Sequence, residues 1–355
     1  MAKTSERDGL PPIKVVGVGG GGCNAVNRMV QARIGVQFVG INTDAQALLR
    51  CDVETRVRIG DRITRGLGVG GDPERGRQAA EESRDELKDT LKGADMVFIT
   101  AGMGGGTGTG AAPLVAQVAK DTGALTVAVV TKPFAFEGAR RRQIAEQGIS
   151  QLQQEVDTLI VIPNDRLLAV CDQKVTVAES FLMADDILRQ GIQGISEVII
   201  TPGDINLDFE DVRRIMAGAG PALMAIGRAG GENRAVEAAQ AAIASPLLDV
   251  SIHGARGVLF NVASSGDLRL HELNLAAQVI AELVDPEAEV IFGTATDPSL
   301  GDEVKITLIA VGFAPAQTFD SRDREHDLRR IRAEALEHLD DTDLPTFLRR
   351  PVSVR

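Results

Sequence analysis

Short, almost continuously apolar runs alternate with longer amphipathic stretches through the first half of the chain. The apolar runs are Ile13–Val18, Val36–Ile41, Val53–Ile59, Ala94–Thr100, Ala124–Val130 and Thr158–Ile162. The longer stretches between them are Ala25–Gln31, Pro73–Leu91, Ala112–Asp121 and Glu137–Glu155. Runs that are apolar throughout are typical of parallel strands covered by helices on both faces. The pattern predicts a Rossmann-like α/β domain, whose ligands bind beyond the carboxyl ends of its strands.

One long apolar helix, Val177–Ile200, separates this domain from a second alternating region. Thr201, Pro202 and Gly203 after it are typical of a helix end. Further strands are expected at Ala222–Ile226, Arg256–Ala263, Ala288–Phe292 and Val304–Val311, with helices at Ala235–Ala244 and Leu270–Leu283. The sequence therefore predicts a second α/β domain, joined to the first through a long central helix.

The predicted domain boundaries follow from these patterns. A disordered N-terminus covers residues 1–12, the first domain 13–175, the central helix with its following turn 176–203, and the second domain 204–314. Residues 315–342 are expected to be a linker, because charges of both signs dominate there. Residues 343–355 regain apolar side chains, as is typical of a tail that binds a partner.

Composition and charge exclude several functions. The 355 residues carry a formal net charge of −12 and include no Trp or Tyr, which argues against nucleic-acid binding through basic surfaces and stacking aromatics. The 3 Cys and 4 His residues show no zinc-binding spacing, so no protein metal site is predicted. Unpaired thiols, no secretory leader and no apolar stretch of about 20 residues predict a cytoplasmic protein without direct membrane insertion.

A first glycine-rich turn, Gly17–Asn24, directly follows the first expected strand. Glycines let the backbone approach a phosphate, and the N-terminus of the next helix attracts the anion. The turn satisfies the pattern GxGxxG, and Asp44 follows the second strand, near the place where a dinucleotide-binding fold has its ribose acid. An NAD-dependent oxidoreductase and a tight turn without a ligand are the alternatives.

A second glycine-rich segment, Gly102–Gly110, follows the strand that ends at Thr100, and six of its nine residues are glycine. So many glycines cost conformational entropy, which a backbone that wraps around an anion would explain. The next helix is expected to begin near Ala111 and to direct its N-terminus at the same place. Neither segment has the lysine of a P-loop, so the two together predict a nucleoside triphosphate held from two sides.

Two further groups of residues leave alternatives open. Asp208 and Asp211 lie three apart at the start of an expected helix, where spacing alone favours helix capping. Carboxylates in the same pocket as phosphates would repel them unless a cation intervened. Phe181 and Asp185 lie one turn apart on the long helix and could stack on and hydrogen-bond a guanine. A core Phe with a surface Asp is the simpler interpretation of that pair.

Together these segments resemble the FtsZ family, the bacterial tubulin-like GTPases of cell division. The resemblance covers Ile13 to about Ala314, together with the tail. Gly104–Gly110 is similar to the GGGTG(S/T)G motif that the family shares with tubulins. The other matching motifs, in the family's order and spacing, are Gly19–Met29, Phe136–Arg141, Pro163–Leu168 and Asn206–Asp211.

The resemblance implies a GTP/GDP site assembled from the first domain and the central helix. The residues implied along the phosphates and the nucleotide are Gly20, Gly21, Gly22, Cys23, Asn24, Gly70, Gly71, Gly106, Thr107, Gly108 and Thr109. Glu137 and Arg141 are implied at the ribose, and Asn164, Phe181 and Asp185 at the guanine, while Asp44 and Thr131 complete the implied set.

The resemblance also implies that the acidic loop works on a neighbouring molecule. Asn206, Asp208 and Asp211 would enter the pocket of the next subunit and position water and Mg²⁺, the ion being bound mainly through the nucleotide phosphates. Such head-to-tail contacts do not close and therefore give filaments. Asp204 and Glu210 stand where the family usually has apolar or small residues, which makes this loop more acidic.

The tail is similar to the family's C-terminal peptide, with the matching residues Leu344, Pro345, Phe347, Leu348 and Arg349. The resemblance implies that the segment Asp343–Arg350 binds membrane-tethering and regulatory division proteins, and that filaments form a ring at mid-cell. A polymerising GTPase is thus the first hypothesis. An NAD-dependent oxidoreductase and a tubulin-like nucleotide-binding module without catalysis are the other two.

Overall fold

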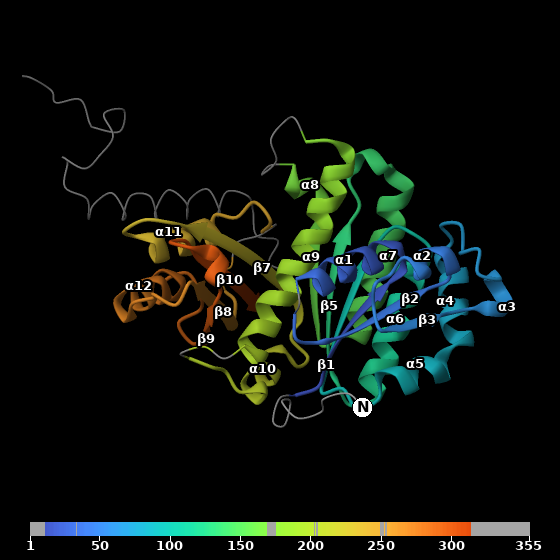
Figure 1. The fold of residues 1–355 in the computed structure, drawn as a ribbon, viewed down its shortest axis with the longest axis horizontal. Helices are drawn as coiled ribbons and strands as arrows, with labels where there is room; N and C mark the ends of the chain where they lie inside the picture. Colours follow the sequence, from blue (N-terminus) through green and yellow to red (C-terminus); the bar gives the residue numbers. More distant parts are fainter. Residues whose placement is uncertain are drawn as a thin grey trace, which may run out of the picture. The chain divides into compact units, whose positions relative to one another are not determined.

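A ten-stranded β-sheet forms the centre of the protein in the computed structural model, which describes residues 11–32, 34–168, 175–201, 203, 205–248, 252 and 254–313 (Figure 1). The strand order is β3-β2-β1-β4-β5-β6-β7-β10-β8-β9. The first six strands are β1 (Ile13–Val18), β2 (Gln37–Asn42), β3 (Thr55–Arg58), β4 (Met96–Gly102), β5 (Leu125–Lys132) and β6 (Thr158–Pro163). The others are β7 (Gly220–Ala229), β8 (Gly257–Ser264), β9 (Glu289–Thr296) and β10 (Val304–Val311).

The sheet is parallel in its first half and mixed in its second. Strands β1 to β6 all pair in parallel, as the buried apolar runs predict. The first residues of β7, Gly220 to Ala222, continue this parallel pairing beside β6. The rest of β7 pairs antiparallel with β10, which is also antiparallel to β8. One continuous sheet therefore joins the two regions that the sequence predicts as separate α/β units.

Twelve α-helices and two short 3₁₀ turns surround the sheet in the described residues. The helices before the long central one are α1 (Gly19–Gln31), α2 (Ala45–Leu49), α3 (Asp61–Thr64), α4 (Pro73–Glu82), α5 (Arg84–Leu91), α6 (Thr107–Asp121), α7 (Ala139–Glu155) and α8 (Asn164–Leu167). The others are α9 (Val177–Ile200), α10 (Phe209–Met216), α11 (Arg234–Ile243) and α12 (Leu270–Ala281), with η1 (Ala135–Glu137) and η2 (Pro298–Leu300).

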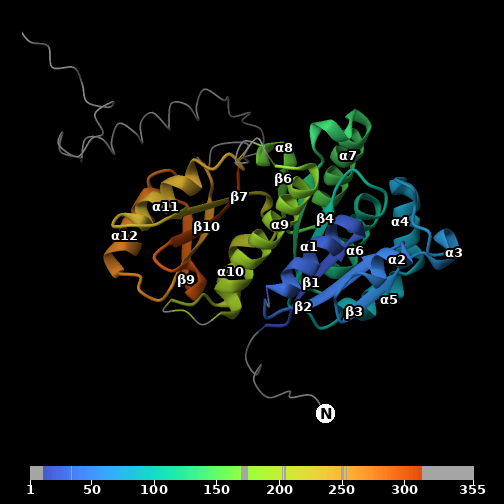
Figure 2. The same cartoon turned by 45° about the horizontal axis from the view of Figure 1, so that its top comes forward.

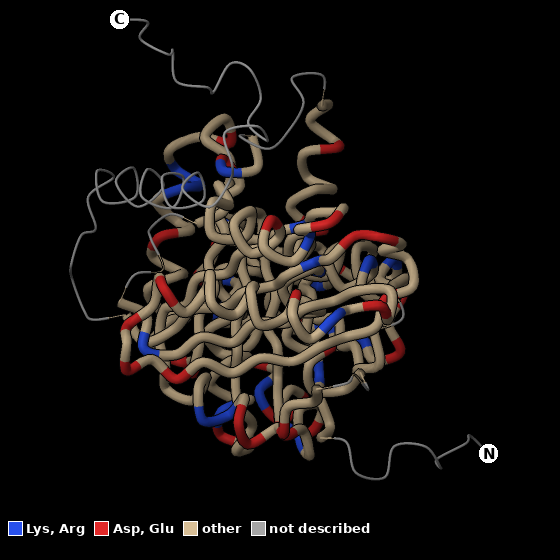
Figure 3. The backbone as a smooth tube through the Cα atoms, turned by 90° about the vertical axis from the view of Figure 1, so that its left-hand side faces the viewer, with Lys and Arg blue, Asp and Glu red and all other residues tan. Residues whose placement is uncertain are grey.

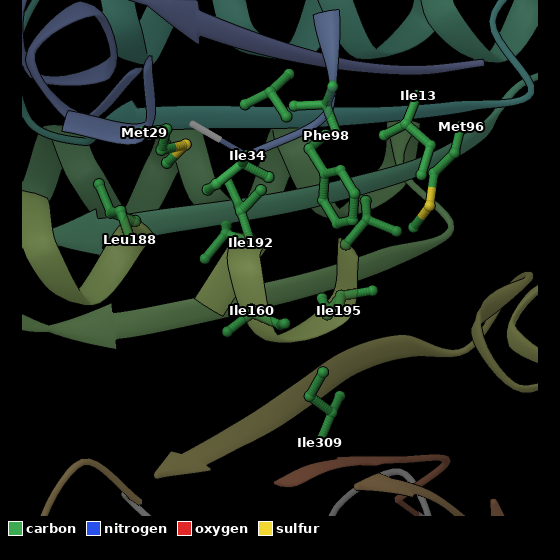
Figure 4. Packing of buried hydrophobic residues seen from close by; sticks show 14 of the residues in the cluster. Ile13, Met29, Ile34, Met96, Phe98, Ile160, Leu188, Ile192, Ile195 and Ile309 are labelled. Carbon is green, nitrogen blue, oxygen red and sulfur yellow. The ribbon is translucent and has the colours of Figure 1, made fainter. Parts of the chain in front are cut away.

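Successive residues of each strand face opposite sides of the sheet, which creates an apolar core on each face. On one face, Val15 of β1 and Phe98 of β4 pack with α1, α9 and α10, and Figure 4 shows Phe98 within this core. On the other face, Val16 and Ile99, the next residues of the same strands, pack with α4, α5, α6 and α7. The predicted two-sided burial of the strands is confirmed.

Helix α9 extends from one edge of the sheet to the other, from α8 to α10 (Figures 1 and 2). Its N-terminus is fixed by a capping box between Thr176 and Glu179. Gly191 and Gly194 let it approach the sheet, because a Cβ atom on them would lie 2.7 Å from Met224 Sδ and 2.5 Å from Thr307 Cγ2. At about 1.5 Å per residue, its 24 residues span about 36 Å.

Four expected helices differ from the observed ones. Helix α1 begins at Gly19 rather than at Ala25, so the first glycine-rich turn includes the start of this helix. The stretch Pro73–Leu91 is two helices, because the chain bends at Ser83. Helix α6 begins at Thr107 rather than near Ala111, so part of the expected loop is the first helical turn. Helix α7 begins at Ala139, after the 3₁₀ turn η1, and the short helices α2, α3 and α8 were not expected.

Several predictions from the sequence lie outside the described residues. They concern residues 1–10 of the N-terminus, Cys171, Asp204, the linker 315–342 and the tail 343–355. Within the described residues, no helix combines the length and the apolar character needed to cross a membrane.

Candidate nucleotide site

The two glycine-rich segments meet at the carboxyl edge of the parallel sheet. Helix α1 follows β1 and helix α6 follows β4, and these two strands are neighbours. A Cβ atom on Gly19 would lie 2.7 Å from the backbone nitrogen of Gly108, and one on Gly21 would lie 3.3 Å from that of Gly102. The first turns of both helices thus lie side by side, and their free N–H groups can approach one anion from two sides.

Most glycines of these segments are explained by close packing within the chain. A Cβ atom on Gly22 would lie 2.3 Å from the carbonyl oxygen of Thr100, and one on Gly110 would lie 1.9 Å from that of Pro73. These contacts bring α1 closer to β4, and α6 closer to α4, than any side chain would allow. The sequence analysis explained these glycines by an anion alone. Their close packing also explains in part why α6 begins at Thr107 and not near Ala111.

Gly20 and Gly105 have no such explanation. Neither has a positive φ, and a Cβ atom on either would meet nothing within 4 Å. The fold would accept a methyl group at both positions, yet both are glycine, as expected where a phosphate must approach the backbone. These two residues carry the argument that the space in front of α1 and α6 fits a nucleotide phosphate chain.

The N-termini of α1 and α6, with the glycine-rich segments before them, are called the cradle below. The threonines of α6 form hydrogen bonds at its edge and within it. Thr107 Oγ1 lies 2.7 Å from Thr43 Oγ1, at the end of β2, and Thr109 Oγ1 accepts a hydrogen bond of 2.8 Å from the Gly104 N–H. Sequence reasoning missed Thr43, although its place beside Asp44 after a buried strand could have indicated it. Two hydroxyl groups therefore meet at the edge of the cradle, while Thr109 fixes the loop before α6.

The predicted residues after β2 and before α4 have local roles as well. Asp44 caps helix α2 by accepting hydrogen bonds from the Gln46 and Ala47 N–H groups, at 2.8 and 3.1 Å. This cap competes with the ribose contact that a dinucleotide-binding fold would require of Asp44. Gly70 and Gly71 adopt φ values of +60° and +81° in an exposed turn before α4, with open space around both.

Cys23 and Thr131 lie deeper than the glycines. The Cys23 thiol points into the core, within 3.7 Å of the Gly17 carbonyl oxygen, and its neighbour Cys51 together with burial raises the pKa of the thiol above its usual value. A contact of Cys23 with a nucleotide would therefore involve its backbone. Asn24 is exposed, one residue further along α1. Thr131 is buried at the end of β5, and its carbonyl oxygen accepts a 3.0 Å hydrogen bond from the Met103 N–H.

A group of phenylalanines lies beside the carboxyl ends of β5 and β6. Phe134 stacks on Phe136 with ring centroids 4.9 Å apart, and Phe181 of α9 meets Phe134 edge-on at 5.6 Å. Phe181 remains 40% exposed, so its ring is only partly covered by the other two. The sequence predicted Phe181 and placed Phe136 in a matching motif without a role, but Phe134, from the same segment as Phe136, was missed. A half-exposed aromatic platform of this kind suits a planar base.

Asp185 is partly buried, unlike the surface carboxylate of the simpler interpretation. Its side chain is only 15% exposed, and its Oδ2 lies 3.9 Å from Nε of Arg28 on α1. Burial raises the pKa of Asp185 to about 7, and the positive charge of Arg28 opposes the rise. Such a carboxylate beside an aromatic platform can accept hydrogen bonds from a ligand with adjacent donors, as guanine has. Arg28 was not predicted from the sequence.

Asn164 offers an unpaired polar atom to the same region. It is the first residue of α8, it is 4% exposed, and its Oδ1 has no hydrogen-bond partner in the structure. A buried amide oxygen without a partner is costly, so a donor from a ligand would stabilise it. It lies between the end of β6 and the start of α9, and its guanine contact stays a prediction.

Glu137 and Arg141 are already engaged with each other. Glu137 accepts a 2.9 Å hydrogen bond from the Phe134 N–H and forms an ion pair with Arg141, which is exposed. A Cβ atom on Gly104 would lie 2.9 Å from the Arg141 carbonyl oxygen, so the start of α7 touches the glycine-rich loop. The pair is thus placed between the cradle and the phenylalanines, where the ribose is expected.

The predicted acidic loop lies at the opposite edge of the sheet. It follows the end of α9, and Ile200 there approaches Gly35, before the start of β2. Asp208 is exposed and occupies the expected N-cap position of α10, but its side chain makes no capping hydrogen bond. Asn206 accepts a 2.7 Å hydrogen bond from the Gly203 N–H, and Asp211 pairs with Arg214 at 3.2 Å. The loop cannot reach its own cradle, because α9 separates them.

Comparisons with known proteins show the family of the chain. A model of the GTPase domain of the Tubulin/FtsZ family matches residues 12–172, and one of the C-terminal domain of the FtsZ family matches residues 220–314. An empty FtsZ dimer from M. jannaschii is 43% identical, with 86% of this chain and 89% of that chain covered and a TM-score of 0.84. An FtsZ point mutant from M. jannaschii gives the same identity and TM-score, with 92% of that chain covered.

A more distant structure shares the fold alone. GDP-bound CetZ1 from Haloferax volcanii is 23% identical, with 92% of this chain and 99% of that chain covered and a TM-score of 0.76. The resemblance noted in the sequence is thus confirmed over both halves of the described fold. The chain belongs to the FtsZ family of tubulin-like GTPases, the cytoskeletal proteins of cell division.

Proposed function

We propose that the chain hydrolyses GTP at the junctions between head-to-tail copies of itself. One copy would bind GTP between α1 and α6, and Asn206, Asp208 and Asp211 of the next copy would complete the site. The observation that carries this proposal is the position of the acidic loop, which follows the far end of α9, a helix about 36 Å long, and lies at the edge of the sheet opposite the cradle. Carboxylates so far from the phosphates can act only on those of another molecule.

Two copies joined in this way each leave one contact surface unused, which explains further assembly. A cradle at one edge and a completing loop at the other form a heterologous contact, which repeats without closing and gives a filament. The M. jannaschii relative, described as a dimer, supports self-association of this chain at 43% identity. GTP-dependent self-assembly would then activate hydrolysis, because only assembled copies have complete sites.

Mg²⁺ would bind mainly through the phosphates in this proposal. The described residues contain no cluster of three or more His, Cys, Asp or Glu side chains that could hold a metal ion. The hydroxyl groups of Thr43 and Thr107 lie at the edge of the cradle, where a phosphate-bound ion would approach. When bound, the ion would neutralise phosphate charge, and the chain's carboxylates would orient water.

We also propose that the filaments lie in the cytoplasm at the division site. The basis is the similarity of the segment Asp343–Arg350 to the C-terminal peptide of the family, which binds membrane-tethering and regulatory division proteins. These residues lie outside the described part of the chain, so the proposal rests on their sequence.

The decisive experiment combines pelleting and phosphate release in the same tube. With GTP, protein should pellet above a threshold concentration, and phosphate release per molecule should rise at the same threshold. A nucleotide-binding module without catalysis would release no phosphate. Equilibrium dialysis with GTP and NAD tests the oxidoreductase alternative, and preferential binding of NAD would contradict the proposal.

The raised pKa of Asp185 predicts a pH dependence of GTP binding. Only the ionised carboxylate can accept hydrogen bonds from two adjacent guanine donors, and the free protein loses this form below its pKa of about 7. Affinity should therefore be highest above pH 7 and fall about tenfold per pH unit below it. Isothermal titration calorimetry between pH 6 and pH 8 measures the effect.

Matched variants separate Asp185 from the titration of GTP itself. Asp185→Asn should bind GTP more weakly at pH 8 and lose the additional decline toward pH 6. Asp186→Asn, the neighbouring carboxylate on α9, should keep the parent profile. If parent and Asp185→Asn have the same pH profile, Asp185 does not bind the base in its ionised form.

A further inference from the structure

We propose that Arg214 is a positioning residue for the Asp211 carboxylate and that Glu289 fixes Arg214 from the sheet. The inference rests on the proposed role of Asp211 in the site of the next copy. Arg214 Nη2 lies 3.2 Å from Asp211 Oδ1, and the same nitrogen forms an ion pair with Glu289 Oε1. The three side chains form a chain of charges that leads from helix α10 to the edge strand β9.

Both ends of this row of three charged side chains are attached to the core. Val212 and Met216 of α10 are fully buried, and the Met216 carbonyl oxygen accepts a hydrogen bond of 2.5 Å from Thr158 Oγ1, at the start of β6. Glu289 begins β9, and its N–H donates a 2.8 Å hydrogen bond to the carbonyl oxygen of Arg256. Arg214 therefore connects two backbone segments that are fixed independently of each other.

The Asp211 side chain needs such a connection because little else restricts it. It lies in the first turn of α10, it is 37% exposed, and Arg214 is the partner found for its carboxylate in the structure. A carboxylate in that position can adopt several rotamers. Arg214 contacts Oδ1, which leaves Oδ2 available to accept a hydrogen bond from water. A fixed carboxylate oxygen reduces the ordering that the reaction would otherwise require.

The preceding arginine has a different role. The guanidinium of Arg213 stacks over the Phe209 ring, 5.1 Å from its centroid, and its Nε lies 3.9 Å from Glu210. Acidic and basic residues are interspersed over the turns and helix ends in Figure 3. Arg214 therefore differs from Arg213 in connecting Asp211 to Glu289, and not in its charge.

The variant Arg214→Gln tests the inference in the full chain. We expect GTP turnover per assembled subunit to fall about tenfold, because misplacing a reacting group lowers the catalytic rate. The affinity of single subunits for GTP and the melting temperature should stay close to the parent values, since the cradle of the same molecule lies at the opposite edge of the sheet and exposed ion pairs contribute little to stability. Arg214→Lys should recover part of the rate, because lysine keeps the charge but lacks the planar fork.

A matched control is Arg77→Gln. Arg77 forms an ion pair with Glu74 at the same spacing of three residues, at 2.8 Å, and is 53% exposed against 59% for Arg214. It lies on α4, and its loss should leave turnover unchanged. An equal loss of turnover in Arg77→Gln would mean that removing any exposed arginine impairs assembly, and would overturn the inference.

Glu289 supplies the second test. Glu289→Gln should lower turnover about threefold, and the double variant with Arg214→Gln should be no slower than Arg214→Gln alone, because Glu289 acts through Arg214. Normal turnover in Arg214→Gln would overturn the inference. So would a loss in Arg214→Gln without one in Glu289→Gln, which would indicate direct contact of Arg214 with the nucleotide. Asp211→Ala in the same assay separates failure of this inference from failure of the proposed function. Normal turnover in Asp211→Ala would contradict the proposed function itself.

Discussion

Replacement of Asp211 by alanine is expected to leave GTP binding and pelleting intact while turnover falls at least about 100-fold. The loss should be large because a group that orients the attacking water contributes about 10²- to 10⁴-fold to such a reaction. Binding should be unaffected because Asp211 lies at the opposite edge of the sheet from the cradle of its own molecule. Phosphate release at a protein concentration well above the threshold measures the effect.

A mixing experiment tests whether Asp211 acts on the next molecule. Asp211→Ala subunits keep an intact pocket, and Gly105→Ala subunits keep an intact loop, so junctions between the two would contain one complete site. The mixture should release more phosphate than the sum of its separate components. A mixture no faster than that sum would show that the loop does not work across subunits.

Another carboxylate of the loop is the natural control. Glu210 lies on the same turn, and its side chain is 79% exposed. It stands where the family usually has an apolar or small residue. Glu210→Gln should therefore stay within about threefold of the parent turnover, a margin set by the loss of one exposed charge.

Replacing Gly20 or Gly105 by alanine is expected to weaken GTP binding about 10- to 100-fold without destabilising the fold. Neither residue has a positive φ, and no atom lies within 4 Å of the added methyl group. The methyl group would instead displace the phosphate from a backbone N–H, and one hydrogen bond to a charged group is worth about 1.5–3 kcal/mol. Calorimetry with GTP and thermal unfolding measure the two quantities.

Two other glycines serve as controls for this prediction, one neutral and one destabilising. Gly230 also lacks a positive φ, and its added methyl group would make only ordinary contacts with Asp302 and Glu303, so Gly230→Ala should change neither quantity. Gly110→Ala should unfold the protein, because the methyl group would lie 1.9 Å from the Pro73 carbonyl oxygen. Unchanged GTP affinity in both Gly20→Ala and Gly105→Ala would place the phosphates elsewhere.

The order and type of the main elements could be predicted from the sequence because the apolar pattern is strong. The helix Val177–Ile200 begins and ends where expected, since a capping box opens it and a change of composition follows it. The start of α6 could not be predicted, because Gly108 and Gly110 are poor helix formers. Their helical conformation depends on close approach to β4 and α4, which only the folded chain provides.

The site was predictable where one segment carries the signal and not where several segments meet. Both glycine-rich segments could be recognised from their glycine content alone. Thr43, Arg28 and Phe134 could not, because each gains its place from contacts with residues far along the chain. Asp208 occupies the predicted N-cap position, but its side chain makes no capping hydrogen bond, a detail that spacing alone does not determine.

The direction of the parallel strands has a mechanical consequence. Strands β1 to β6 and helix α9 all run between the cradle edge and the acidic-loop edge. A force that pulled these two edges apart would act along the strands, so the hydrogen bonds of each ladder would bear the load together, in shear. The parallel contact of β7 with β6 runs in the same direction but is only three residue pairs long, so it would bear little of the load. The orientation that separates the two half-sites is thus also the one in which a sheet resists tension best.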